Sequence, residues 1–176
     1  MKIVDLTGAG DLFAAGFIHG IINNISTKEV KDQIKPNANL GIALNSTVSG
    51  GNINLNVNMK FLENFSNLKL IVYVLEDGLL YNQVNATSFF GGQNPIINFE
   101  HNHVLRACLT NLVVGDAITG TNADALVTRN FTVNVPANIS NVANMYFVAF
   151  VLDASGKAIN VRGAAPNVTQ TFQINP

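Results

Sequence analysis

Residues 52–59 read Asn52-Ile53-Asn54-Leu55-Asn56-Val57-Asn58-Met59, a strict alternation of amide and apolar side chains. Successive side chains of an extended strand point to opposite faces, so this stretch places its apolar residues on one face and its asparagines on the other. The pattern predicts a strand with one face in a core and one face in solvent. The Gly50-Gly51 pair before it is typical of a tight turn from a preceding strand that contains Ile42 and Leu44.

The two-residue period continues outward from this strand to the end of the chain. Leu68, Leu70, Val72 and Val74 repeat it, and Ile71 and Tyr73 indicate apolar cover on the second face as well. Glu76-Asp77-Gly78 predicts a hairpin turn into a strand over 79–84, and residues 85–100 and 111–125 are expected to be loops. Further strands are predicted at 101–109, 127–135, 145–152, 159–162 and 168–174.

About eight or nine short strands separated by turn residues favour a two-sheet antiparallel sandwich over an α/β fold. The fold class predicted is therefore mainly β, an immunoglobulin-like sandwich over residues 38–176 with a short helical appendage over residues 1–36. In that appendage the apolar residues recur at helical spacing, Phe17 less cleanly than the others: Leu12, Ala15, Phe17, Ile18, Ile21 and Ile22.

Composition limits the function classes. The chain has 176 residues, of which 48% are hydrophobic and 12% charged, so it can build a core without a metal or disulfide. Cys108 is the single cysteine and is expected to be an inert core thiol. A net charge of −1 with scattered basic residues argues against nucleic-acid binding. No apolar run reaches the length of a membrane span, and no export signal is expected in the chain as written.

Residues 5–17 carry a glycine-rich turn, Thr7-Gly8-Ala9-Gly10-Asp11, ahead of the predicted helix. This stretch resembles the C-terminal signature of ribokinase-like (PfkB) sugar and adenosine kinases. The resemblance implies that Gly8, Ala9 and Gly10 form an anion hole and that Asp11 is a catalytic base. It covers only about the first 30 residues, whereas a doubly wound sheet needs several βαβ units of about 30 residues each. We therefore expect a remnant and no enzyme activity; the alternative is a fragment of a kinase that transfers a phosphoryl group from ATP to a hydroxyl.

A second resemblance covers about three quarters of the chain. Its residues are Val74–Gly78, Tyr81–Gln83, His101–Arg106, Gly115–Ile118 and Val148–Val151. Together they resemble the C-terminal immunoglobulin-like domain of a bacterial outer-membrane lipoprotein family, in which a thioredoxin-like domain comes first. The resemblance implies a non-catalytic structural or interaction module of the bacterial cell envelope, outer membrane-associated or periplasmic. It also implies a protein or glycan partner and no cofactor.

His101 and His103 are the candidate ligand residues. On one strand, residues two apart face the same way, so both imidazoles could meet one metal ion. A third ligand would have to come from Asp77, Asp116 or Cys108. The alternatives are a polar network with Arg106 that pins a loop to a sheet, and a metal- or carbohydrate-binding surface beside His101.

Overall fold

The computed structural model describes residues 39–86, 88 and 90–172, and these residues form antiparallel β-structure. The ten strands of this part of the chain are β1 (Leu40–Ser49), β2 (Asn52–Phe61), β3 (Lys69–Glu76), β4 (Leu79–Gln83), β5 (Ile96–His101), β6 (Val104–Cys108), β7 (Asp116–Ala117), β8 (Leu126–Asn134), β9 (Met145–Leu152) and β10 (Ala158–Ala164). Two short 3₁₀ turns are η1 (Phe90–Gly92) and η2 (Val142–Asn144). The mainly β prediction is confirmed, and the predicted helical appendage at 1–36 lies outside the described residues.

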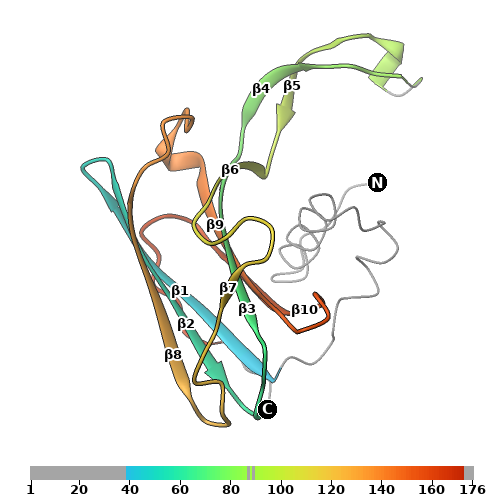
Figure 1. Cartoon of the computed structure of the whole chain (residues 1–176). Helices are drawn as coiled ribbons and strands as arrows, with labels where there is room; N and C mark the ends of the chain where they lie inside the picture. Colours follow the sequence, from blue (N-terminus) through green and yellow to red (C-terminus); the bar gives the residue numbers. More distant parts are fainter. Residues whose placement is uncertain (1–38, 87, 89, 173–176) are drawn as a thin grey trace.

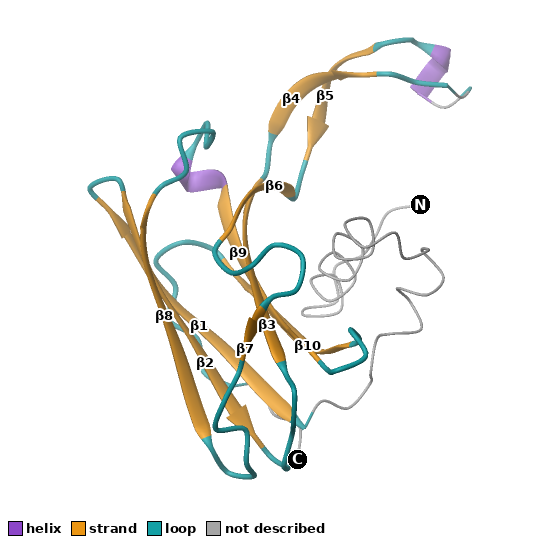
Figure 2. Ribbon diagram, viewed as in Figure 1, coloured by secondary structure: helices purple, strands orange, loops and turns teal. Residues whose placement is uncertain are grey.

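The strands form two larger sheets that face each other and one separate hairpin (Figures 1 and 2). The first sheet has the order β1-β2-β8 and the second has the order β10-β9-β3-β6, with β7 paired to the start of β3. Strands β4 and β5 pair with each other and project from one end of the two layers. The termini of the described chain lie at the opposite end from this hairpin (Figure 1).

The alternating segment forms β2, as its pattern predicts. Ile53, Leu55, Val57 and Met59 have no exposed surface and point into the core between the two sheets. The asparagines occupy the outer face, where the Thr132 hydroxyl donates to Asn54 Oδ1 (3.0 Å) and the Thr128 hydroxyl to Asn58 Oδ1 (2.8 Å). Cross-strand pairs of this kind hold the register of β2 against β8. Alternation therefore decides both the core and the solvent face of the first sheet.

The free edge of β1 is covered by residues 167–170, which follow β10. The backbone N–H of Ser46 donates to Val168 O (3.1 Å), and that of Gln170 donates to Leu44 O (3.2 Å). The side chain of Gln170 accepts from the N–H of Leu44 at 3.0 Å. An isolated antiparallel bridge joins Asn45 and Thr169. This short segment, in the region predicted as a strand at 168–174, thus pairs with β1 without forming a full strand in the described part.

Three local predictions are wrong. Residues 76–78 do not turn β3 into a paired β4; β3 pairs with β9 on one side and with β6 and β7 on the other. Residues 85–100 are not wholly loop, because they contain most of β5. The strand predicted at 101–109 is broken, since β5 ends at His101 and β6 begins at Val104. In each case the local pattern is strand-like, while the pairing partner depends on distant residues.

Candidate interaction site

A buried carboxylate anchors the base of the projecting hairpin. Glu76 closes β3 and has no exposed surface. Arg106 Nε on β6 donates to its Oε2 at 2.7 Å, and the backbone N–H groups of Ser140 and Asn141 donate to its Oε1 at 2.8 and 2.6 Å. Burial alone would raise the pKa of Glu76, but these hydrogen bonds and the Arg106 charge outweigh it, so the pKa is lowered. The ionised carboxylate ties β3, β6 and the loop before β9 together.

The two turns beside Glu76 also hold each other. The backbone N–H of His103 donates to Asp77 Oδ1, and that of Gly78 donates to Asn102 Oδ1 at 2.7 Å. The N–H of Asp77 donates to Asn144 O at 3.0 Å. Both chain crossings into the hairpin are therefore fixed to the sandwich. The hairpin leaves the body of the molecule from a firmly bonded base.

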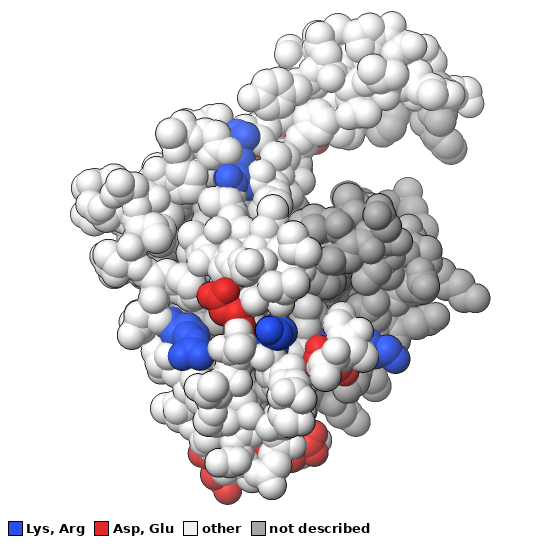
Figure 3. Space-filling view, in the orientation of Figure 1, with Lys and Arg blue, Asp and Glu red and all other residues white. Residues whose placement is uncertain are grey.

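We call β4, β5 and their connection, residues 79–101, the hairpin arm. Its surface is nearly uncharged, with apolar side chains exposed among amides: residues 79–99 contain no Asp, Glu, Lys or Arg. Leu80, Tyr81, Val84 and Ile97 are 59%, 57%, 73% and 51% exposed. In Figure 3 the arm is white over almost all of its visible surface, whereas the body carries scattered acidic and basic side chains. Apolar side chains exposed this far on a projecting element are typical of a contact surface.

One face of the arm carries three rings. Tyr81 on β4 lies opposite Phe99 on β5, and the His101 ring centroid is 6.3 Å from that of Tyr81 and 5.1 Å from that of Phe99. His101 Nε2 is buried and has no hydrogen-bond partner among the described residues. The ring planes are inclined by 54° and 73°, so the rings stabilise one another in tilted and edge-to-face contacts. The sequence pointed to His101 as a ligand residue and to Tyr81 only through the family resemblance, and it did not point to Phe99; the long uncharged run around them was the available signal.

The two candidate histidines do not share a strand face. His101 is the last residue of β5, and His103 lies in the turn with a left-handed φ of 56°. His103 Nδ1 lies 3.8 Å from Asp77 Oδ1, whereas the His101 ring meets the Phe99 ring edge to face in the arm. Arg106 binds Glu76 and neither histidine, so the network predicted for these three residues is wrong in its partners. The strand premise behind a shared metal ion is also wrong, because positive φ at His103 ends the two-residue alternation.

The other proposed metal ligands lie apart. Cys108 lies opposite Tyr73 on β3, with its Sγ 3.4 Å from the Thr110 hydroxyl. Asp116 accepts from the N–H of Asn111 at 3.0 Å. Within residues 39–86, 88 and 90–172, no three side chains of His, Cys, Asp or Glu gather closely enough to hold a metal ion. Gly8, Ala9, Gly10 and Asp11 lie outside the described residues.

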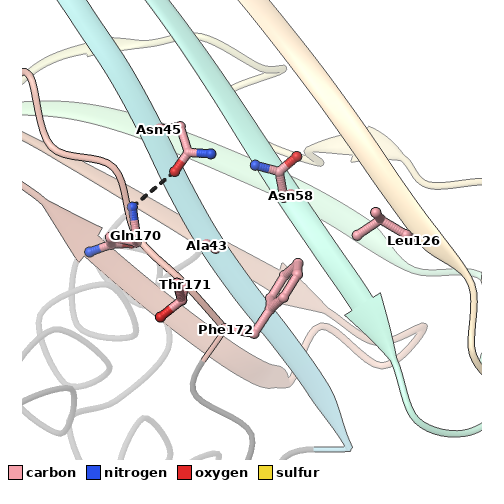
Figure 4. Close-up of a pocket in the computed structure, with 7 residues that line it drawn as sticks. All are labelled: Ala43, Asn45, Asn58, Leu126, Gln170, Thr171 and Phe172. Atoms are coloured by element: carbon pink, nitrogen blue, oxygen red, sulfur yellow. Dashed lines mark hydrogen bonds between the residues drawn. The ribbon is translucent and has the colours of Figure 1, made fainter.

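A shallow hollow of about 340 Å³ lies on the outer face of the first sheet (Figure 4). Amide side chains of Asn45, Asn58 and Gln170 surround it, together with the Phe172 ring and Leu126. The N–H of Gln170 donates to Asn45 Oδ1 at 2.9 Å, which fixes one wall. The hollow offers hydrogen bonds and apolar contact but no ionisable side chain. It lies away from the hairpin arm.

Comparison with known proteins identifies a matching family for this chain and a solved structure of similar fold. The model of the family described as outer membrane protein Omp28 matches residues 19–170, which confirms the resemblance to an outer membrane protein family. That match begins after the kinase-like signature of residues 5–17. No curated protein matches the sequence. Among the described residues, the structure contains no helix with the length and apolar character needed to cross a membrane.

The fold is similar to that of HBP35 of Porphyromonas gingivalis, with a TM-score of 0.52 and 19% sequence identity. The match covers 87% of this chain and 50% of HBP35, so the chain spans about half the length of that protein. Chicken MD-1 complexed with lipid IVa matches with a TM-score of 0.33 and 8% identity over 76% of this chain and 94% of MD-1. The latter score is too low to show a shared fold.

Proposed function

Because this chain belongs to the outer membrane protein Omp28 family of the bacterial cell envelope, we propose that it is a non-catalytic interaction module of the envelope. In this proposal the body is an immunoglobulin-like sandwich, and the hairpin arm is the surface that meets a partner. The family description names outer membrane proteins and no enzyme activity.

The observation that carries the proposal is the contrast between the arm and its base. The arm exposes Leu80, Tyr81, Val84 and Ile97. Its base is held by the buried Glu76 carboxylate, which accepts hydrogen bonds from two backbone N–H groups and from Arg106. A contact element presented on a fixed base loses little conformational freedom on binding, which favours association.

The chemistry of the arm indicates the kind of partner. Residues 79–99 have no charged side chain, so the arm does not attract a strongly charged partner electrostatically. Exposed aliphatic and aromatic groups fit an apolar protein surface, and the free backbone edges of β4 and β5 can add hydrogen bonds to an extended strand. The proposed partner of the hairpin arm is therefore another protein of the cell envelope.

In-cell photo-cross-linking tests this proposal. A photoreactive residue replacing Val84 is expected to give a cross-linked adduct of defined mass, while the same residue at Val113 on the body is the control. Both positions are similarly apolar and well exposed. Leu80→Ser combined with Ile97→Ser should abolish the Val84 adduct. Equal adducts from both positions, or an adduct that survives the serine substitutions, would contradict the assignment of the arm.

A second candidate function is glycan binding on the ring face of the arm, favoured by the three rings of Tyr81, Phe99 and His101. Aromatic faces pack against the apolar faces of sugars, and the buried His101 Nε2 has no hydrogen-bond partner among the described residues. Tyr81 and Leu80 are adjacent on β4 and therefore face opposite sides. Glycan binding predicts that Tyr81→Ala abolishes binding to an envelope glycan array while Leu80→Ser does not. Binding unaffected by Tyr81→Ala would contradict it.

A further inference from the structure

The second sheet has a second apolar face, directed away from the core between the sheets. Its residues are no more than 5% exposed: Ile71, Tyr73, Leu75, Val148, Phe150, Leu152, Ala158 and Val161. We call this set the outer apolar face. The rings of Tyr73 and Phe150 meet edge to face at its centre, with centroids 5.3 Å apart. Leu105, Cys108 and Tyr146 pack against it and are partly buried.

All of these side chains come from one sheet. They belong to β3, β9 and β10, and their partly buried neighbours belong to β6 and β9. Side chains of a sheet stand roughly perpendicular to it, so neighbours in the same sheet enclose their flanks but not their outer ends. The first sheet packs against the opposite face, through the core that contains Leu70, Val72 and Val74. Burial of the outer apolar face therefore requires a further layer.

We propose that the outer apolar face is the docking surface for the segment of this chain that precedes Asn39. That segment has 38 residues. Its residues Leu12, Ala15, Ile18 and Ile22 recur at the spacing of one helix face, and helices cover sheets by burying such a stripe. The occupant is thus a part of the same polypeptide, with complementary apolar character.

The other parts of the chain outside the described residues are too short or too distant. Residues 173–176 extend at most about 14 Å, whereas the face crosses three strands. Residues 87 and 89 are single positions and cannot cover a face of several strands. Only the segment before Asn39 combines enough length with enough apolar side chains.

The start of β1 brings that segment to the correct sheet. The side-chain amide of Asn160 on β10 donates to Leu40 O at 2.6 Å. The chain thus reaches β1 beside β10, which is the edge strand of the second sheet. The family match begins at residue 19, so residues 19–38 are part of the same family unit as the sandwich.

The environment of Tyr73 favours an apolar cover over the centre of the face. Its hydroxyl is buried and has no hydrogen-bond partner among the described residues. Burial, and to a lesser extent the nearby Cys108, raises the pKa of Tyr73. Water or a polar cover over Tyr73 would supply a partner, since buried hydroxyls ordinarily find one. An apolar helix stripe would leave the hydroxyl in the state observed.

Cys108 is a built-in reporter for this docking, because it is the single thiol and lies partly buried at the border of the face. A heterobifunctional thiol–amine reagent on the full chain is expected to join Cys108 to lysines of the segment, namely Lys2, Lys28, Lys31 or Lys35. Peptide mass analysis that finds Cys108 joined within one chain only to Lys60, Lys69 or Lys157 would overturn the proposal. Adducts that form only between two chains would overturn it in favour of a second copy.

A pair of matched variants gives an independent readout. Ile18→Glu with Ile22→Glu is expected to raise the rate of Cys108 labelling by a thiol reagent several-fold, with the β-sheet circular dichroism retained. Asn23→Glu with Asn24→Glu adds the same charge at neighbouring polar positions and should leave the rate unchanged. Equal rates in the two folded variants would contradict the docking. If the isoleucine variant fails to fold, the cross-linking of the unaltered chain still decides.

Discussion

Arg106 Nε lies 2.7 Å from Oε2 of Glu76, a carboxylate with no exposed surface. The arginine side chain is itself only 13% exposed, so this pair is held away from solvent where β3 and β6 meet the loop before β9. Two backbone N–H groups complete the carboxylate's hydrogen bonds. Loss of either partner would leave a buried charge or buried donors unpaired. Such a loss strongly destabilises the folded state.

Arg106→Met is therefore expected to lower the free energy of unfolding by about 3–5 kcal/mol. Urea denaturation measures the change. The control is Lys60→Met, because Lys60 forms an ion pair with Asp124, whose side chain is 90% exposed, and such surface pairs contribute about 0–1 kcal/mol. Similar losses in the two variants would contradict a special role for the Glu76 pair.

The stability of the protein should fall in acid through Glu76. Its pKa in the folded state is lowered from the ordinary value of 4.5, so its contribution is fully present above pH 4.5 and is lost as pH falls through the folded pKa. In Glu76→Gln this contribution is absent at every pH. We expect the difference in unfolding free energy between the two proteins to be constant from about pH 6 to 8 and to shrink below pH 4.5. A difference that does not change down to pH 3 would contradict this reasoning.

Gly115 is a position where a side chain cannot be added. Its φ is +66°, and a Cβ there would lie 2.8 Å from Leu70 O and 2.9 Å from Ile71 Cγ1. Gly156 has a φ of +83° but open space around it, so Gly156→Ala bears the backbone cost alone, about 1–2 kcal/mol. Gly115→Ala should be clearly more destabilising, because β3 or the turn before β7 must shift. Thermal melts that show equal losses would refute the clash.

Tyr73→Phe is expected to stabilise the fold by about 1 kcal/mol, because it removes a buried hydroxyl that has no hydrogen-bond partner in the described part of the chain. Chemical denaturation measures the change. Tyr81→Phe serves as the control, since Tyr81 is 57% exposed and its hydroxyl change should be nearly neutral. A loss of stability in Tyr73→Phe would show that the hydroxyl is satisfied in solution.

The sequence predicted what depends on local alternation and missed what depends on distant pairing. Ile53 to Met59 and Met145 to Leu152 could be assigned because each carries its own pattern of burial. Glu76-Asp77-Gly78 has the composition of a hairpin turn, yet its carboxylate is buried by Arg106 and a loop more than sixty residues away. His103 adopts a positive φ, a conformation that histidine and asparagine reach more often than most residues, but the two-residue alternation did not indicate the break between β5 and β6.

The same distinction explains the candidate sites. His101 was singled out as a histidine, but its surroundings depend on the pairing of β4 with β5, which brings Tyr81 and Phe99 beside it. Ile71 and Tyr73 indicated the outer apolar face in the sequence. They alternate with the apolar residues of the core face, and a strand that is apolar on both faces requires burial on both. Its cover could not be assigned from the alternation, since that signal describes a strand and not the layer above it.

Residues 167–170 lie along β1, and this has a consequence for self-association. Exposed strand edges recruit further chains through unpaired backbone groups. With the N–H groups of Leu44, Ser46 and Val48 already donated to this segment, that side of the first sheet is closed to such recruitment. Within the described structure, growth of this sheet by another polypeptide is thus left to the opposite border, at β8. A chain cut before Asn167 would have two unpaired strand edges in the first sheet, at β1 and at β8. Strands of other chains would then be able to pair at either edge.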